Sequence, residues 1–97
     1  MKVLHVIDSG GLYGAEMMLI NLVENQVKLG VDPLILSYGD IGVAEKKLET
    51  EASARGLPIK PVRVRAGLNL LAGLSLIRYA KREGVDVIHS HGYKFNI

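Results

Sequence analysis

Three segments of this chain repeat one pattern: a stretch with helical spacing, then a glycine, then a run rich in β-branched residues. They read VKLGVDPLILS, SARGLPIKPVRVR and KREGVDVIHSH, and their glycines are Gly30, Gly56 and Gly84, spaced 26 and 28 residues apart. Glycine is the usual residue for ending a helix in the left-handed conformation. The repeat length is that of successive strand–helix units. The pattern therefore predicts an α/β fold with the order β-α-β-α-β-α-β.

The strands differ in how their side chains alternate, and this predicts their order in the sheet. Residues 3–8, 33–37 and 85–89 are nearly continuous apolar runs, as parallel strands covered on both faces require. Residues 59–65 instead alternate valine with arginine and contain a proline, which places them at an edge. With right-handed crossovers, we expect a Rossmann-like, doubly wound parallel sheet of four strands in the order 3-2-1-4. Helices on both faces would make three α/β/α layers.

Hydrophobic spacing predicts helices over residues 15–29, 43–55 and 69–83. The first should be deeply packed, and the second should be a solvated outer helix capped by Asp40. The expected apolar positions are Met18, Leu19, Ile20, Leu22, Val23 and Val27 in the first helix, Ala44, Leu48 and Ala52 in the second, and Leu70, Leu74 and Ile77 in the third.

Composition excludes several classes of protein. The chain has 97 residues, of which 48% are hydrophobic, and this suits one globular core. It has no cysteine, so disulfide scaffolds and thiolate metal sites are excluded. A net charge of +2 and five aromatic residues are too few for a nucleic-acid interface, and we expect no nucleic-acid partner. The start is too short for a signal peptide, and the apolar run 68–77 is shorter than the roughly 18 residues of a membrane span. We expect a cytoplasmic protein.

The expected ligand site is the crevice beyond the carboxyl ends of the first and fourth strands, where the strand order reverses. The segment DSGGLYGAE leaves the first strand there, and HSHGYK leaves the fourth. Gly10 and Gly11 would leave backbone N–H groups uncovered, and Gly14 would let the following helix approach closely. This arrangement predicts an anion site, although a strand-to-helix turn can also use small residues for its own geometry. Glu16 would complement the helix dipole and lie near the site.

Two histidines near the end of the chain are candidates for chemistry. His89 and His91 are two residues apart, so both project to the same side of an extended chain. We expect His91, one step into the loop, to face the crevice as a hydrogen-bond donor or proton-transfer group; the alternative is two satisfied histidines in a turn. Because no cysteine or carboxylate on that segment completes a ligand set, we expect no metal site. His5, inside a buried strand, should be a hydrogen-bonded structural residue.

A dinucleotide-binding fold is the main rival. Ser9, Gly11 and Gly14 occupy the three glycine positions of G-x-G-x-x-G, with serine replacing the first. The second strand ends in Ser37 and Tyr38 rather than in an acidic residue for a ribose. An NAD(P)-binding oxidoreductase domain and a non-catalytic flavodoxin-like binding module stay open as alternatives.

The segments MKVLHVIDSGGLYGAEMMLINLV and GVDVIHSHGYK resemble the amino-terminal domain of GT-B glycosyltransferases, in particular the retaining family 4 (group 1) enzymes. The resemblance implies that residues 1–97 are an incomplete acceptor-side domain, inactive by itself, whose missing second domain binds most of the donor. It also implies retaining transfer of a sugar from a nucleotide-diphosphate sugar to a glycan, lipid or small-molecule acceptor. No obligatory metal and no cofactor apart from this substrate are implied.

Carried over by position, Gly10, Gly11 and Gly14 would lie against the donor diphosphate, and His91 would contact the transferred sugar as the catalytic residue. Further substrate contacts would come from Glu16, Tyr93 and Lys94.

Truncation would leave the fourth strand with a bare edge, which predicts self-association across residues 85–89. The basic residues of the third strand, Lys60, Arg63 and Arg65, suit peripheral contact with the inner membrane face or, alternatively, an ordinary solvated edge.

Overall fold

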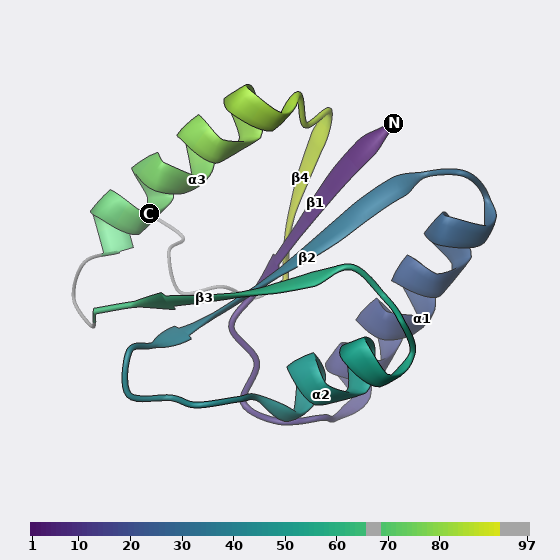
Figure 1. The fold of residues 1–97 in the computed structure, drawn as a ribbon, viewed down its shortest axis with the longest axis horizontal. Coiled ribbons are helices and arrows are strands. Elements are labelled where there is room, and N and C mark those ends of the chain that lie inside the picture. The colour runs from purple at the N-terminus through teal and green to yellow at the C-terminus, as the bar shows by residue number, and fades with distance from the viewer. Residues whose placement is uncertain (66–68, 92–97) are drawn as a thin grey trace.

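The computed structural model describes residues 1–65 and 69–91. Strands and helices alternate along the chain as the sequence predicts (Figure 1). The elements are β1 (Lys2–Ile7), α1 (Gly14–Lys28), β2 (Asp32–Asp40), α2 (Lys47–Ala54), β3 (Ile59–Val64), α3 (Asn69–Glu83) and β4 (Val87–His91).

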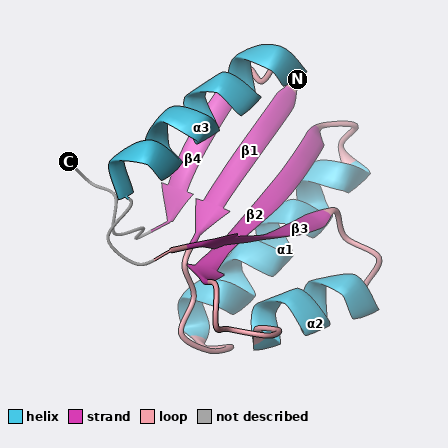
Figure 2. Cartoon of the chain, turned by 60° about the vertical axis from the view of Figure 1, so that its left-hand side comes forward, coloured by secondary structure: helices cyan, strands magenta, loops and turns pink. Residues whose placement is uncertain are grey.

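The four strands form one parallel sheet in the order β3-β2-β1-β4, which confirms the predicted order (Figure 2). Strand β1 lies between β2 and β4, so that Ile7 pairs with Ser37 on one side and with His91 on the other. Strands β3 and β4 are the two edges. The carboxyl ends of β1 and β4 are therefore direct neighbours.

Each face of the sheet carries its own hydrophobic core. Helices α1 and α2 cover one face, and α3 covers the other, which gives the expected three α/β/α layers (Figure 1). The core under α1 and α2 consists of Ile7, Leu19, Ile20, Val23, Ile35, Leu48 and Ala52. The core under α3 consists of Leu4, Val6, Leu36, Tyr38 and Ala80. Alternate residues of β1 and β2 point into different cores, which explains why these strands read as continuous apolar runs.

The glycines after the helices adopt the predicted left-handed conformation. Gly30, Gly56 and Gly84 have φ angles of 81°, 69° and 67°. Only glycine adopts such angles without steric cost. These three residues stop α1, α2 and α3 and turn the chain back toward the sheet.

The predicted burial of α1 is only partly right. Leu19, Ile20 and Val23 are buried, but Met18, Leu22 and Val27 are 73%, 38% and 47% exposed. Met18 and Leu22 lie on the flank of α1 toward β4 and line a cavity beside that strand. Among the described residues no strand lies beyond β4, so this flank has no sheet to pack on.

The predicted face of α3 is also wrong. Leu74 and Ile77 are half exposed, whereas Leu76, Tyr79 and Ala80 pack on the core. The side chain of Leu70 lies outside the described residues. Helix α3 thus contacts β1 and β2 with a neighbouring face and leaves Leu74 and Ile77 of the predicted stripe partly uncovered.

Helix α2 begins at Lys47, later than predicted. Asp40 is the last residue of β2 and does not cap the helix, and Ala44 lies in the exposed loop between them. The helix is capped at Lys46, whose amide donates to Glu49 Oε1 at 3.0 Å. Leu48 and Ala52 are fully buried, as expected. Within the described residues, no helix is both long and apolar enough for a membrane span.

Candidate functional site

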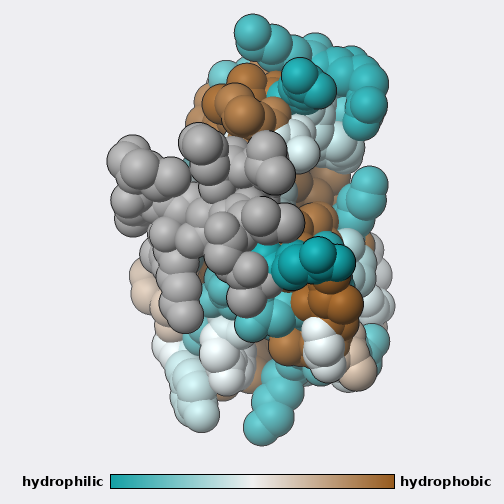
Figure 3. Space-filling model, turned by 90° about the vertical axis from the view of Figure 1, so that its left-hand side faces the viewer, coloured by the Kyte–Doolittle hydropathy of each residue, from teal (hydrophilic) through white to brown (hydrophobic). Residues whose placement is uncertain are grey.

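The structure brings the starts of the two predicted loops together at the carboxyl ends of β1 and β4. Ile7 and His91 are register partners at the ends of parallel neighbours β1 and β4, so no strand separates the glycine-rich segment from the histidine pair. Viewed from the side toward which β2 and β3 run, the described surface mixes hydrophobic and hydrophilic side chains (Figure 3). The predicted adjacency of the two strand ends is confirmed, whereas a ligand site shared by their loops stays a prediction. Tyr93 and Lys94 lie outside the described residues.

The glycine-rich segment has open space where side chains would stand. A Cβ atom built on Gly10 or Gly14 meets nothing within 4 Å, and neither residue has a positive φ. A Cβ atom on Gly11 would come within 2.5 Å of the Tyr13 ring, which is itself exposed. Contacts within the described chain therefore do not require glycine at Gly10 or Gly14, and at Gly11 only the exposed Tyr13 ring would have to move.

Glu16 orders the start of α1. Its Oε1 atom accepts the backbone N–H of Tyr13 at 3.0 Å, and the residue is only 8% exposed. This bond satisfies one of the donors that a helix start leaves without a helical partner. Gly14 and Ala15, the first residues of the helix, are exposed beside the site. Contact of Glu16 with a substrate stays a prediction.

Lys46 anchors the site, a role that the sequence alone does not predict. Its Nζ atom lies 2.6 Å from Asp8 Oδ1, 3.0 Å from the Ser9 carbonyl and 2.6 Å from the Tyr38 carbonyl. Its side chain is 10% exposed. One ammonium group thus links the ends of β1 and β2 and holds the first residues of the glycine-rich segment. Nothing in the local sequence distinguishes Lys46 from Lys47, which is exposed.

Arg63 is not a solvated edge residue as predicted. Its guanidinium donates to both carboxylate oxygens of Glu49, at 2.8 and 2.9 Å, and to the carbonyls of Val43 and Ala44. Both side chains are largely buried, which removes Arg63 from any membrane-facing set. Burial alone would raise the pKa of Glu49, but hydrogen bonds, including those from the Lys46 amide and Arg63, and the charge of Arg63 lower it from 4.5.

A cluster of three imidazoles lies at the junction of β1 and β4. His5 is fully buried; its Nε2 atom is 2.8 Å from Gln26 Oε1, and its Nδ1 atom is 2.9 Å from His91 Nε2. The rings of His89 and His91 are 3.9 Å apart, so they share a side as predicted. His91 is the last residue of β4 rather than a loop residue, because the strand begins and ends two residues later than expected.

Burial controls the charge of these imidazoles. Desolvation, followed by the charges of His89 and His5, lowers the pKa of His91 to about 4. Burial also lowers the pKa of His5, although its bond to Gln26 opposes this effect. His91 is therefore neutral at pH 7 and offers one N–H donor and one lone pair.

A cavity of about 370 Å³ lies beside the histidines. Its walls are Ala15, Met18, Leu19 and Leu22 of α1, and His89 and His91 of β4. The imidazoles of His89 and His91 and the first turns of α1 thus face the same cavity. This arrangement suits a ligand that presents both an apolar surface and a hydrogen-bonding group.

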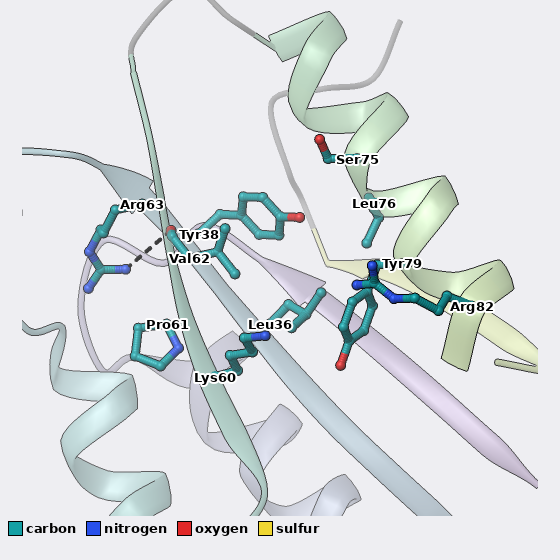
Figure 4. A pocket seen from close by; sticks show the side chains of 10 residues that line it. All are labelled: Leu36, Tyr38, Lys60, Pro61, Val62, Arg63, Ser75, Leu76, Tyr79 and Arg82. Atoms are coloured by element: carbon teal, nitrogen blue, oxygen red, sulfur yellow. Dashed lines mark hydrogen bonds between the residues drawn. The ribbon is translucent and has the colours of Figure 1, made fainter. Parts of the chain in front are cut away.

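A second cavity, of about 400 Å³, lies between the sheet and α3 (Figure 4). The ammonium of Lys60 lies 5.3 Å from the centre of the Tyr79 ring, and the guanidinium carbon of Arg82 lies 5.8 Å from it. Arg63 also lines this cavity, but its guanidinium lies on the side of β3 away from α3. The cationic and aromatic side chains are on the α3 face, whereas the histidines belong to the α1 face.

The chain is similar to known proteins in its sequence and in its fold. The sequence model of the family described as Glycosyltransferase Family 4 matches residues 13–97. No curated protein matches the chain significantly. Among solved structures, the chain is similar to a "predicted subunit of tRNA methyltransferase" from Methanocaldococcus jannaschii, with a TM-score of 0.52 and 17% identity over 97% of this chain. The match covers 54% of that protein, so this chain spans about half its length. At this identity the likeness concerns the fold alone.

Proposed function

This chain belongs to Glycosyltransferase Family 4, and we propose that it is the acceptor-side part of an enzyme that transfers a sugar from a nucleotide-diphosphate sugar. The acceptor is a glycan, a lipid or a small molecule. The chemistry retains the configuration of the sugar and needs no metal ion for the transfer step. A second domain supplies most of the contacts to the nucleotide.

The observation that carries this proposal is the open space at Gly10, in the loop before α1, and at Gly14, the first residue of α1. Neither an unusual backbone angle nor an internal contact accounts for glycine at these positions. Close approach of a ligand to the backbone does account for it. The positive end of α1 favours an anion there by about 0.3–1 kcal/mol, and backbone amides of Gly10, Gly11 and Gly14 would add direct hydrogen bonds to a diphosphate.

His91 has the chemical character that a sugar contact needs. It lines the cavity beside the first turns of α1, and its lowered pKa, about 4, keeps the imidazole uncharged at neutral pH. An uncharged imidazole donates a hydrogen bond to a sugar hydroxyl without a permanent positive charge next to the reacting bond. In this proposal the leaving phosphate takes the proton from the acceptor. Glu16, Tyr93 and Lys94 stay predicted substrate contacts.

The proposed location is the cytoplasm. With a lipid acceptor, the enzyme would work at the inner membrane face. The exposed basic residues Lys60, in edge strand β3, and Arg65, directly after it, would then approach anionic lipid headgroups. Each would contribute about 1 kcal/mol to membrane binding.

Donor titration of matched glycine variants tests the proposal. Gly10→Ala adds a methyl group in open space, as Gly73→Ala does on α3, so both variants should fold. We expect Gly10→Ala to weaken binding of uridine or guanosine diphosphate sugars about tenfold, or about 1.4 kcal/mol, while Gly73→Ala binds normally. His91→Ala should also lose affinity for the sugar-bearing ligand, with a smaller loss for the free nucleoside diphosphate.

Two results would contradict the proposal. One is equal donor affinity in Gly10→Ala and Gly73→Ala. The other is saturable binding of NAD with no response to diphosphate sugars, which would instead favour an oxidoreductase domain.

A further inference from the structure

Three imidazoles from two strands meet on the α1 face of the sheet, although His5 is far from the other two in the sequence. One ring nitrogen from each of His5, His89 and His91 lies within 4.8 Å of the other two. We propose that these three residues form a binding site for a single transition-metal ion of the class that imidazole favours, with Zn²⁺ as the first choice.

The spacing of one nitrogen pair, from His5 and His91, is close to that of a metal site. A Zn–N bond of about 2.0–2.1 Å places nitrogens of a tetrahedral site about 3.3–3.4 Å apart. His5 Nδ1 and His91 Nε2 are 2.9 Å apart, so they need to separate by only a few tenths of an ångström. His89 supplies the third nitrogen from an exposed position on β4, within 4.8 Å of the other two nitrogens, so its ring must move closer to bind the same ion.

Gln26 of α1 orients the buried ligand. Its carbonyl oxygen Oε1 lies 2.8 Å from His5 Nε2 and accepts the proton of that nitrogen. The lone pair of His5 is then on Nδ1, which faces His91. Metal-binding histidines commonly hold their other ring N–H in this way, and the partner fixes the orientation of the ring.

Without an ion, the proton of His91 Nε2 occupies the position between the two rings. Binding an ion requires this proton to move to Nδ1 of the same ring, so His91 stays uncharged. Among the described residues, His89 makes ring contacts but no hydrogen bond. Its lone pair is therefore available to an ion.

Three protein ligands leave one position of a tetrahedral ion open. The cavity of about 370 Å³ borders His89 and His91, and its other lining residues are apolar side chains of α1. Water would fill the fourth position from this side. The proposal concerns metal binding alone and does not rest on the function proposed above.

Cobalt titration of the untagged chain tests the site. We expect Co²⁺ to give the visible bands of a four-coordinate ion with one ion per chain, and we expect Zn²⁺ to displace it. His89→Ala removes an exposed ligand and should fold; it should weaken binding at least tenfold. Gln26→Leu removes only the partner of His5 and should weaken binding by about 10–100-fold.

Ser90→Ala is the matched control. Ser90 lies between the two histidines on β4 but pairs with Val6, which faces α3, so this variant should bind Co²⁺ as the parent chain does. Circular dichroism of each variant verifies folding. The proposal is overturned if the parent chain gives no cobalt bands at millimolar ion, or if His89→Ala binds Co²⁺ as tightly as Ser90→Ala.

Discussion

Two largely buried cationic side chains determine the local structure where the parallel strands end. Lys46 and Arg63 look like surface residues in the sequence. Yet Lys46 donates to two backbone carbonyls and to the Asp8 carboxylate, and Arg63 donates to backbone carbonyls and to both carboxylate oxygens of Glu49. Removing a buried cation leaves its acceptors without a partner, and this costs more than the interaction contributes.

Replacing Lys46 by methionine tests its anchoring role. Lys46→Met keeps the apolar stem but leaves Asp8 and two carbonyl oxygens without their donor. We expect the free energy of unfolding to fall by about 1–3 kcal/mol in urea denaturation. Lys47→Met, on an exposed neighbour, should change it by less than about 0.5 kcal/mol. Equal effects of the two substitutions would show that the lysine contacts do not contribute to stability.

Glu49 makes stability depend on pH. Its pKa in the folded chain is lowered from 4.5, so the unfolded chain takes up this proton at a higher pH than the folded chain does. Acid therefore favours unfolding, and the contribution of Glu49 is present above pH 4.5 and lost as the pH falls through its folded pKa.

We expect Glu49→Gln to be less stable than the parent chain at pH 7 and to lose less stability between pH 5 and pH 3, measured by urea denaturation at each pH. Glu45→Gln, at an exposed position, serves as the control and should keep the slope of the parent chain. A parent-like slope in Glu49→Gln would assign the acid sensitivity to other groups.

At the scale of the elements, the two edges of the sheet differ. Strand β3 is protected by its proline and by the Arg63–Glu49 pair. Strand β4 is mostly exposed, with Val87 and Ile88 at 43% and 45%. Leu22 of α1, which is 38% exposed, lines the cavity beside this strand.

Strand β4 is the expected site of self-association, because an open parallel edge presents unpaired backbone groups to another strand. We expect concentration-dependent dimers of the chain in sedimentation velocity, weakened at least tenfold by Ile88→Lys. Leu29→Lys introduces the same charge at a residue 80% exposed after α1 and should leave association unchanged. A monomer at high concentration would contradict this prediction.

At the scale of the whole molecule, the topology followed from the sequence because local patterns encode it. Glycines stop each helix, apolar runs mark the inner strands, and alternation marks β3 as an edge. The packed faces of α1 and α3 were harder to predict. Hydrophobic spacing shows which residues are apolar, but the width of the sheet beneath a helix decides which of them are covered.

The site was predictable only in outline for a similar reason. Adjacent strands β1 and β4 placed the two candidate loops together, as the strand order requires. The imidazole cluster escaped prediction because His5 and His89 become partners only through the register of β1 with β4. Lys46 escaped because its partners, Asp8 and the Tyr38 carbonyl, belong to two other segments.

The ammonium group shared by the ends of β1 and β2 has a consequence for recognition. A ligand that binds at the ends of β1 and β2 meets a backbone that is already ordered, so binding costs little backbone conformational entropy. Selectivity on this side then comes from shape and hydrogen-bond placement fixed during folding. Any closing movement around a bound molecule must come from segments that Lys46 does not hold.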